Sequence, residues 1–138
     1  MEKKEWEKGI PLYHESDLMT ELELLHFAME IVMDFEIKPN SYEIIATNNK
    51  IGTYPNFVLK KDNLLYFIVV EVAIAPKMPI LDKVIRSNLL KHAKSFNAIS
   101  YYAPVSFGSS DAERFEASLA LRGDGFYANY KGLELLNS

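Results

Sequence analysis

Apolar residues recur every three or four positions in two long segments of the chain, a pattern typical of helices that bury one face. In residues 17–36 these positions are Leu18, Leu22, Leu25, Met29 and Val32. In residues 79–96 they are Leu81, Ile85, Leu89, Ala93 and Phe96. The sequence therefore predicts two amphipathic helices. Thr20 and Glu23 have the spacing of a capping box, although Ser16 or Asp17 would serve equally well as the first cap.

Between and after these segments the pattern changes to short apolar runs bounded by polar turns, which is typical of strands. The predicted strands are residues 42–47, 56–60, 64–74, 98–105 and 125–130. The polar loop between the second and third runs has the length of a hairpin, so these two strands should pair. The third run is apolar on both faces, which predicts a central strand covered on both sides.

A third helix is predicted near residues 111–122, because Ser110 and Glu113 form a capping box and Gly123 is a good terminator. The whole order indicates an α/β protein with a central mixed sheet flanked by helices. The third strand, second helix and fourth strand should form a right-handed crossover with parallel strands. We expect residues 1–138 to form a single domain, with a polar arm over residues 1–14.

Composition narrows the possible functions. The 138 residues include no cysteine, which excludes a disulfide framework and a thiolate zinc site. The longest apolar stretch, residues 64–70, is far shorter than the about 20 residues of a membrane-spanning helix. Because the N-terminal segment is also charged, we expect a soluble, cytoplasmic protein without a membrane partner.

The net charge of −4 argues against a generic nucleic-acid binder. Residues 76–97 are an exception, with five basic residues against one acidic residue. A phosphate-binding surface therefore stays open as a prediction. Its candidate residues are Lys83, Arg86, Lys91 and Lys94.

One carboxylate, Glu71, interrupts the apolar strand 64–74. A charge in such a place is costly unless it is paired, neutralised or bound to a metal. Pairing with Lys91, Arg86 or His92 across the interface between sheet and helix would give it a purely structural role. The alternative is a ligand-binding role, and the residues alone leave both open.

Tyr54-Pro55-Asn56 opens the second strand, and Glu71-Val72-Ala73 follows in the third, 15 residues after Asn56. Together with the element order, these motifs resemble the PD-(D/E)XK nuclease-like superfamily over roughly residues 17–105. The resemblance implies a restriction-endonuclease-like αβββαβ core, here with an extra C-terminal helix and strand. In that family an Asp and a Glu jointly hold a divalent metal, and a Lys helps to activate the attacking water.

The chain departs from the family pattern at two of three positions. Asn56 offers no charge and Ala73 offers no amine, so the motif resembles that of catalytically inactive members. The resemblance gives Glu71, Asn56 and Lys91 as the residues of a degenerate catalytic site. It implies a binding or interaction module without a cofactor, whose partner is another protein, a second copy of the chain or a nucleic acid.

Two alternatives remain. The first is a magnesium-dependent nuclease with a rearranged site, in which Glu21 or Glu43 joins Glu71 as a metal ligand and the second helix supplies a lysine. Magnesium prefers oxygen ligands, especially charged ones, so a second carboxylate is what such a site needs. The second alternative is a structural homo-oligomeric domain in which the old cleft is filled.

Overall fold

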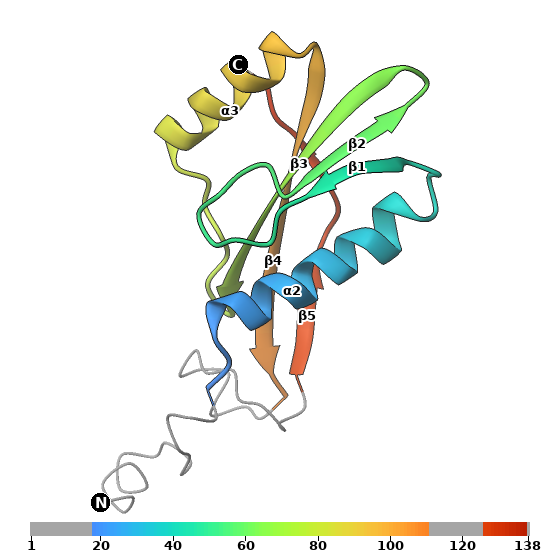
Figure 1. Ribbon diagram of the computed structural model, residues 1–138. Coiled ribbons are helices and arrows are strands. Elements are labelled where there is room, and N and C mark those ends of the chain that lie inside the picture. The colour runs from blue at the N-terminus through green and yellow to red at the C-terminus, as the bar shows by residue number, and fades with distance from the viewer. Residues whose placement is uncertain (1–17, 111–125, 138) are drawn as a thin grey trace, which may run out of the picture.

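A mixed sheet organises the part of the chain that the structure describes, residues 18–110 and 126–137 of a computed structural model (Figure 1). Its strands are β1 Glu43–Thr47, β2 Phe57–Lys61, β3 Leu64–Ile74, β4 Ala98–Ser109, β5 Phe126–Tyr130 and β6 Glu134–Leu135. The strand order is β1-β2-β3-β4-β5, and β6 also pairs with β4. β3 and β4 are parallel, whereas the other neighbours are antiparallel. The predicted α/β class with a mixed sheet is confirmed.

The β2–β3 hairpin forms as predicted, and its turn residues explain why. Lys61 pairs with Leu64, which leaves two residues in the turn. Asp62 and Asn63 both have positive φ, at 52° and 65°. A two-residue hairpin turn of this kind requires left-handed backbone at both positions, which Asp and Asn tolerate better than most residues. The turn therefore fixes the register of the longest antiparallel pair next to the candidate site.

The first helix, α2 Glu21–Val32, begins at the capping box formed by Thr20 and Glu23. This settles the choice of cap, because both reciprocal side-chain hydrogen bonds are present. The helix continues into a π-helical segment, η2 Met33–Ile37. One predicted inward position is wrong: Leu22 is 44% exposed. The buried positions are Leu24, Leu25, Ala28 and Val32.

The second helix, α3 Lys83–Ser95, starts later than predicted. Asp82 is its N-cap and accepts hydrogen bonds from the backbone N–H groups of Val84 and Ile85. The side chain of Asp82 satisfies backbone N–H groups of the first turn, whereas a first turn at Pro79 would only lack one such group. The cap therefore decides where the helix begins. Leu89 and Ala93 are buried as predicted, whereas Phe96 is 54% exposed.

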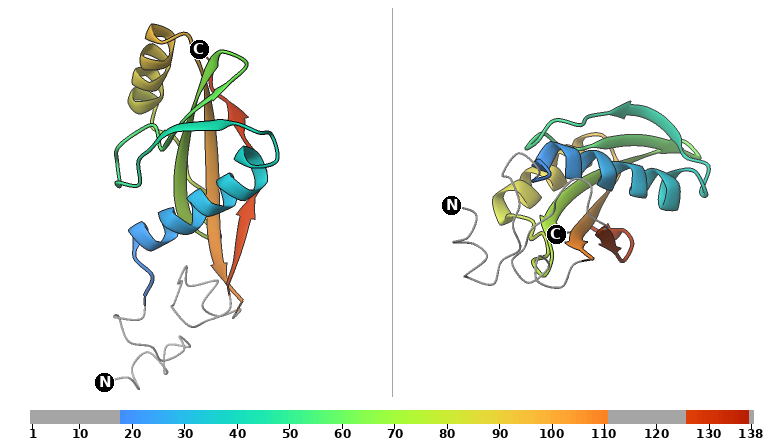
Figure 2. Two further views of the ribbon diagram at one scale, coloured as in Figure 1. Left: turned by 45° about the vertical axis from the view of Figure 1, so that its right-hand side comes forward. Right: turned by 90° about the horizontal axis from the view of Figure 1, so that it is seen from below.

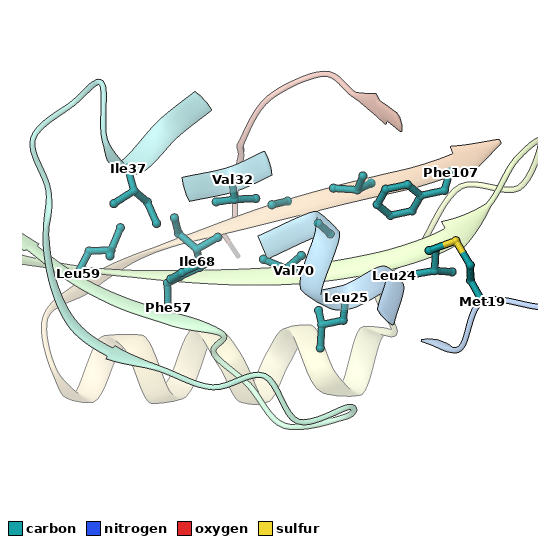
Figure 3. Close-up of a cluster of buried hydrophobic side chains, with 13 residues drawn as sticks. Met19, Leu24, Leu25, Val32, Ile37, Phe57, Leu59, Ile68, Val70 and Phe107 are labelled. Atoms are coloured by element: carbon teal, nitrogen blue, oxygen red, sulfur yellow. The ribbon is translucent and has the colours of Figure 1, made fainter. Parts of the chain in front are cut away.

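α2 and α3 lie on opposite faces of β3 and β4 (Figures 2 and 3). Successive side chains of a strand point to opposite faces. Ile68 and Val70 accordingly belong to the larger buried cluster under α2, which Figure 3 shows. Val69 packs instead with Leu89 of α3 in a smaller cluster. The prediction that residues 64–74 form a strand covered on both sides is confirmed.

β4 is longer than predicted, ending at Ser109 rather than at Val105. Two strands share its outer edge: β6 pairs at Tyr101 and Tyr102, and β5 pairs from Val105 to Ser109. β6 was not predicted, because two residues carry no periodic signal. The predicted helix near 111–122 and the predicted arm over 1–14 lie outside the described residues. Among the helices that are described, none has the length and apolar character needed to cross a membrane.

Candidate functional site

A cleft of about 230 Å³ opens between the start of α2, the loop 50–54, the middle of β3 and residues 79–80. Three of the predicted site residues line it: Glu21, Asn56 and Glu71. Lys50 lines it as well, although the sequence analysis did not single it out. The loop 48–52 was recognised only as a turn, and its closeness to Glu71 depends on how β2 is placed against β3. Gly52, with φ of +76°, allows the loop to turn back toward the sheet.

Two tyrosine hydroxyl groups satisfy the carboxylate of Glu71. Tyr54 donates to Oε2 and Tyr102 donates to Oε1, each at 2.8 Å. Burial, and next the hydrogen bond to Glu71, raises the pKa of both Tyr54 and Tyr102 above that of a free tyrosine. Both hydroxyls therefore stay protonated and remain donors at neutral pH. A buried charge can be stabilised by neutral donors, as here, as well as by a cation.

The expected basic partners of Glu71 are not what holds it, so this part of the sequence analysis is corrected. The guanidinium of Arg86 donates to the carbonyl oxygen of Asn137 at 2.8 Å. The ring of His92 lies against those of Phe67 and Phe96, with centroids 5.4 and 5.1 Å away. Lys91 lines a different cavity, so the structure does not bring it to the cleft as a degenerate catalytic residue.

Asn56 is 1% exposed, and both the oxygen and the nitrogen of its side-chain amide make hydrogen bonds to the backbone. Its Oδ1 accepts from the backbone N–H of Val70 at 2.7 Å, and its Nδ2 donates to the carbonyl oxygen of Asn48 at 3.1 Å. Its backbone N–H donates to the carbonyl oxygen of Ile68 at 2.9 Å. Asn56 thus joins the 48–56 loop to β3.

The two other acidic candidates, Glu21 and Glu43, lie in different places. Glu21 faces the cleft from the first turn of α2. Glu43 lies on the exposed edge strand β1, paired with Lys60 of β2, and is not part of the cleft. The structure therefore does not place Glu43 in the cleft beside Glu71.

The donors around Glu71 fit a divalent metal poorly. Within residues 18–110 and 126–137, no group of three or more His, Cys, Asp or Glu side chains is arranged to hold a metal ion. Two carboxylates line the cleft, and both oxygens of one of them already accept hydrogen bonds. Magnesium needs a near-octahedral set of oxygens, and the protein supplies few of them here.

Comparison with protein families gives one match, over residues 22–136, described as "Domain of unknown function (DUF8840)". The chain belongs to this family. The matched segment contains Asn56, Glu71 and both of its tyrosine partners, and it begins one residue after Glu21. Searches of curated proteins and of solved structures returned no match.

The same matched segment contains a second cavity, of about 660 Å³, between α3 and the β4–β6 edge. Lys91 and Lys94 line it. Lys83 lies at the other end of α3, and Arg86 donates a hydrogen bond to the carbonyl oxygen of Asn137. At helical spacing, these four predicted phosphate-binding residues share one side of α3. Their role in nucleic-acid binding stays a prediction. We call this cavity the α3 groove.

Proposed function

We propose that this protein is a restriction-endonuclease-like domain that acts by binding rather than by hydrolysis. The order α2-β1-β2-β3-α3-β4 supports the αβββαβ type. So do the β2–β3 hairpin and the parallel pairing of β3 with β4 across α3. The candidate motif falls where that type of fold would have its site: Asn56 comes just before β2 and Glu71 lies in β3.

The observation that carries the proposal is the position of the Asn56 amide. Its oxygen receives the Val70 N–H and its nitrogen faces the Asn48 carbonyl. An aspartate at this position would keep the first bond but would set a carboxylate oxygen against that carbonyl. The amide is therefore suited to holding the loop, and the charge needed for a paired-carboxylate metal site is absent.

The surroundings of Glu71 support the same conclusion. A carboxylate that holds a metal benefits from open lone pairs and a nearby second charge. Glu71 instead receives a hydroxyl donor on each oxygen, from the loop before β2 and from β4. In this arrangement the former catalytic position joins three parts of the sheet together, and Ala73 supplies no lysine for water activation.

A metal-dependent nuclease is the second candidate, favoured by one observation. Glu21 and Lys50 line the same cleft as Glu71. These residues would provide a second carboxylate and an amine from positions outside the usual motif. Such a site would differ from the one expected from the sequence, which took its lysine from α3.

Incubation with Mg²⁺ or Mn²⁺ and with single- and double-stranded DNA and RNA separates the two candidates. We expect no cleavage, and no metal-dependent heat in calorimetry at millimolar ion concentrations. Glu21→Gln and Glu71→Gln are the informative variants, and Glu43→Gln is the matched control outside the cleft. Cleavage that is lost in both informative variants and kept in the control would overturn the proposal.

Binding itself is tested on the intact chain by salt-dependent gel retardation with the same nucleic acids and by light scattering. If nucleic acid is the partner, retention should fall steeply with salt and should be weakened by replacing Lys83 and Lys91 together. A stable homo-oligomer without retention would make a second copy the partner. A monomer that neither retains nucleic acid nor binds protein or small ligands would contradict a binding role.

A further inference from the structure

The α3 groove has the size of a small-molecule site. Its volume of about 660 Å³ falls within the range of about 300–1,000 Å³ that is common for ligand pockets. Among the described residues, Lys91 and Lys94 are the charged residues of its lining, and no acidic or aromatic side chain contributes to it. The groove therefore combines positive charge with an aliphatic wall.

The aliphatic part comes from both sides of the groove. Leu90 contributes from α3, and Leu136 contributes from the chain end that contains β6. Leu136 is anchored, because its backbone N–H donates to the carbonyl oxygen of Ser100 at 2.9 Å and its side chain is buried. Leu135 pairs with Tyr101, whose side chain packs in the cluster under α2, so the side chain of Leu135 faces the other side of the sheet. An apolar ligand chain lying along Leu90 and Leu136 would remove the exposed part of Leu90 from water.

Ser100 provides a separate indication of a ligand. The residue is 3% exposed and lines the groove, yet its hydroxyl oxygen has no hydrogen-bond partner within residues 18–110 and 126–137. Ser100 pairs with Phe67 in the register of β3 and β4 and therefore faces the α3 side of the sheet. A buried hydroxyl without a partner costs about 1–3 kcal/mol, so such groups are uncommon unless something else satisfies them.

The chemistry of the lining selects the class of ligand. Two lysines and a hydroxyl favour an anionic group, and the leucines favour an aliphatic body. Lys91 and Lys94 lie in the last turns of α3, where the free carbonyl groups of the helix carry partial negative charge. A ligand with one negative charge is therefore favoured over a ligand with two. The lining offers neither a free arginine fork nor an aromatic ring, which argues against a phosphate dianion or a stacked base.

We propose that the α3 groove binds an aliphatic monocarboxylate of medium chain length. The ammonium groups of Lys91 and Lys94 hold the carboxylate, and Ser100 donates its hydroxyl hydrogen to the ligand. Leu90 and Leu136 contact the chain. This site is separate from the Glu71 cleft, and it requires neither the loss nor the survival of hydrolysis there.

Titration of the ¹⁵N-labelled protein with sodium octanoate tests the proposal, with calorimetry for affinity. We expect saturable shifts at residues 90–100 and 135–137. Octylammonium, which reverses the charge, and octanol, which removes it, should bind at least about 10-fold more weakly. The Lys91→Glu/Lys94→Glu double variant should likewise bind octanoate at least about 10-fold more weakly, a loss of about 1.4 kcal/mol.

Lys83→Glu is the control, because it reverses the charge of one lysine on the same helix outside the groove. It should keep the affinity within about 2-fold, and Ser100→Ala should weaken it while leaving the remaining spectrum unchanged. Equal binding of octanoate and octanol would overturn the proposal. So would equal losses in Lys83→Glu and the double variant, or binding of an oligothymidylate at the groove in place of octanoate.

Discussion

The Glu71 cleft and the α3 groove lie on the same sheet and differ in how their polar groups are satisfied. In the cleft, Glu71 and Asn56 each have partners for their polar atoms from at least two separate parts of the chain. In the groove, two lysines are exposed and the hydroxyl of Ser100 has no partner among the described residues. The cleft carries the residues that a sequence motif points to, whereas the groove carries a buried hydroxyl that the described part of the protein leaves without a hydrogen bond.

This difference changes how the two regions should respond to substitution. Replacing a cleft residue removes hydrogen bonds that hold the fold, so the effect should appear in stability. Replacing a groove residue should leave the fold intact and affect ligand binding.

Asn56→Ala should give the largest loss of stability. It leaves the Val70 N–H and the Asn48 carbonyl without their partner, and a buried unsatisfied polar group costs about 1–3 kcal/mol. Asn56→Asp should also destabilise, because its second oxygen would face the Asn48 carbonyl. Urea denaturation followed by circular dichroism measures both changes in the free energy of unfolding.

Asn88→Ala is the matched control, since Asn88 is exposed on α3, and it should change stability by less than about 0.5 kcal/mol. If Asn56→Asp were as stable as the wild type and gained metal-dependent heat, the structural role given to the amide would be wrong. The position would then be a metal site that lacks only its charge.

The tyrosine–glutamate network predicts an alkaline loss of stability. The pKa values of Tyr54 and Tyr102 are raised in the folded protein by burial and by Glu71. Their contribution to stability is therefore complete below the ordinary tyrosine pKa of about 10 and is lost as pH rises above it. Tyr54→Phe/Tyr102→Phe should show a smaller loss of unfolding free energy between about pH 9 and 11 than the wild type.

Glu71→Gln sharpens this test. Removing the negative charge should bring both tyrosine pKa values closer to the ordinary value, which also reduces the alkaline loss of stability. Ultraviolet titration of tyrosinate absorbance measures the ionisation directly. Unchanged alkaline behaviour in Glu71→Gln would show that the carboxylate does not influence the two hydroxyls.

Ser100→Ala should have the smallest effect on the free protein and should act in the opposite direction. Removing a buried hydroxyl without a partner should stabilise the unliganded fold by up to about 1 kcal/mol. Ser106→Ala, at a buried hydroxyl that also has no partner in the described part of the chain, should do the same. Thermal unfolding measures both, and only Ser100→Ala should weaken octanoate binding. A loss of stability in Ser100→Ala would show that its hydroxyl is satisfied within the protein.

Local features of the fold could be predicted because they depend on residues close in sequence. The capping box of Thr20 and Glu23 and the Asp62-Asn63 turn each involve residues no more than three positions apart. The predicted start of α3 was too early because several residues there suit a first turn, and only the bonds of Asp82 identify the cap. The short strand β6 needs β4 as its partner and has no signal of its own.

By itself, the sequence determined the α/β class, the central strand and the unusual position of Glu71. It also limited the metal chemistry, because no arrangement of the chain can give Asn56 a charge or Ala73 an amine. The tertiary structure decided what surrounds these residues. Tyr54 and Tyr102 lie 17 and 31 positions from Glu71, and Leu136 lies 36 positions from Ser100. Such contacts depend on strand register and on the placement of α3, which are set by packing of the whole sheet and not by any local pattern.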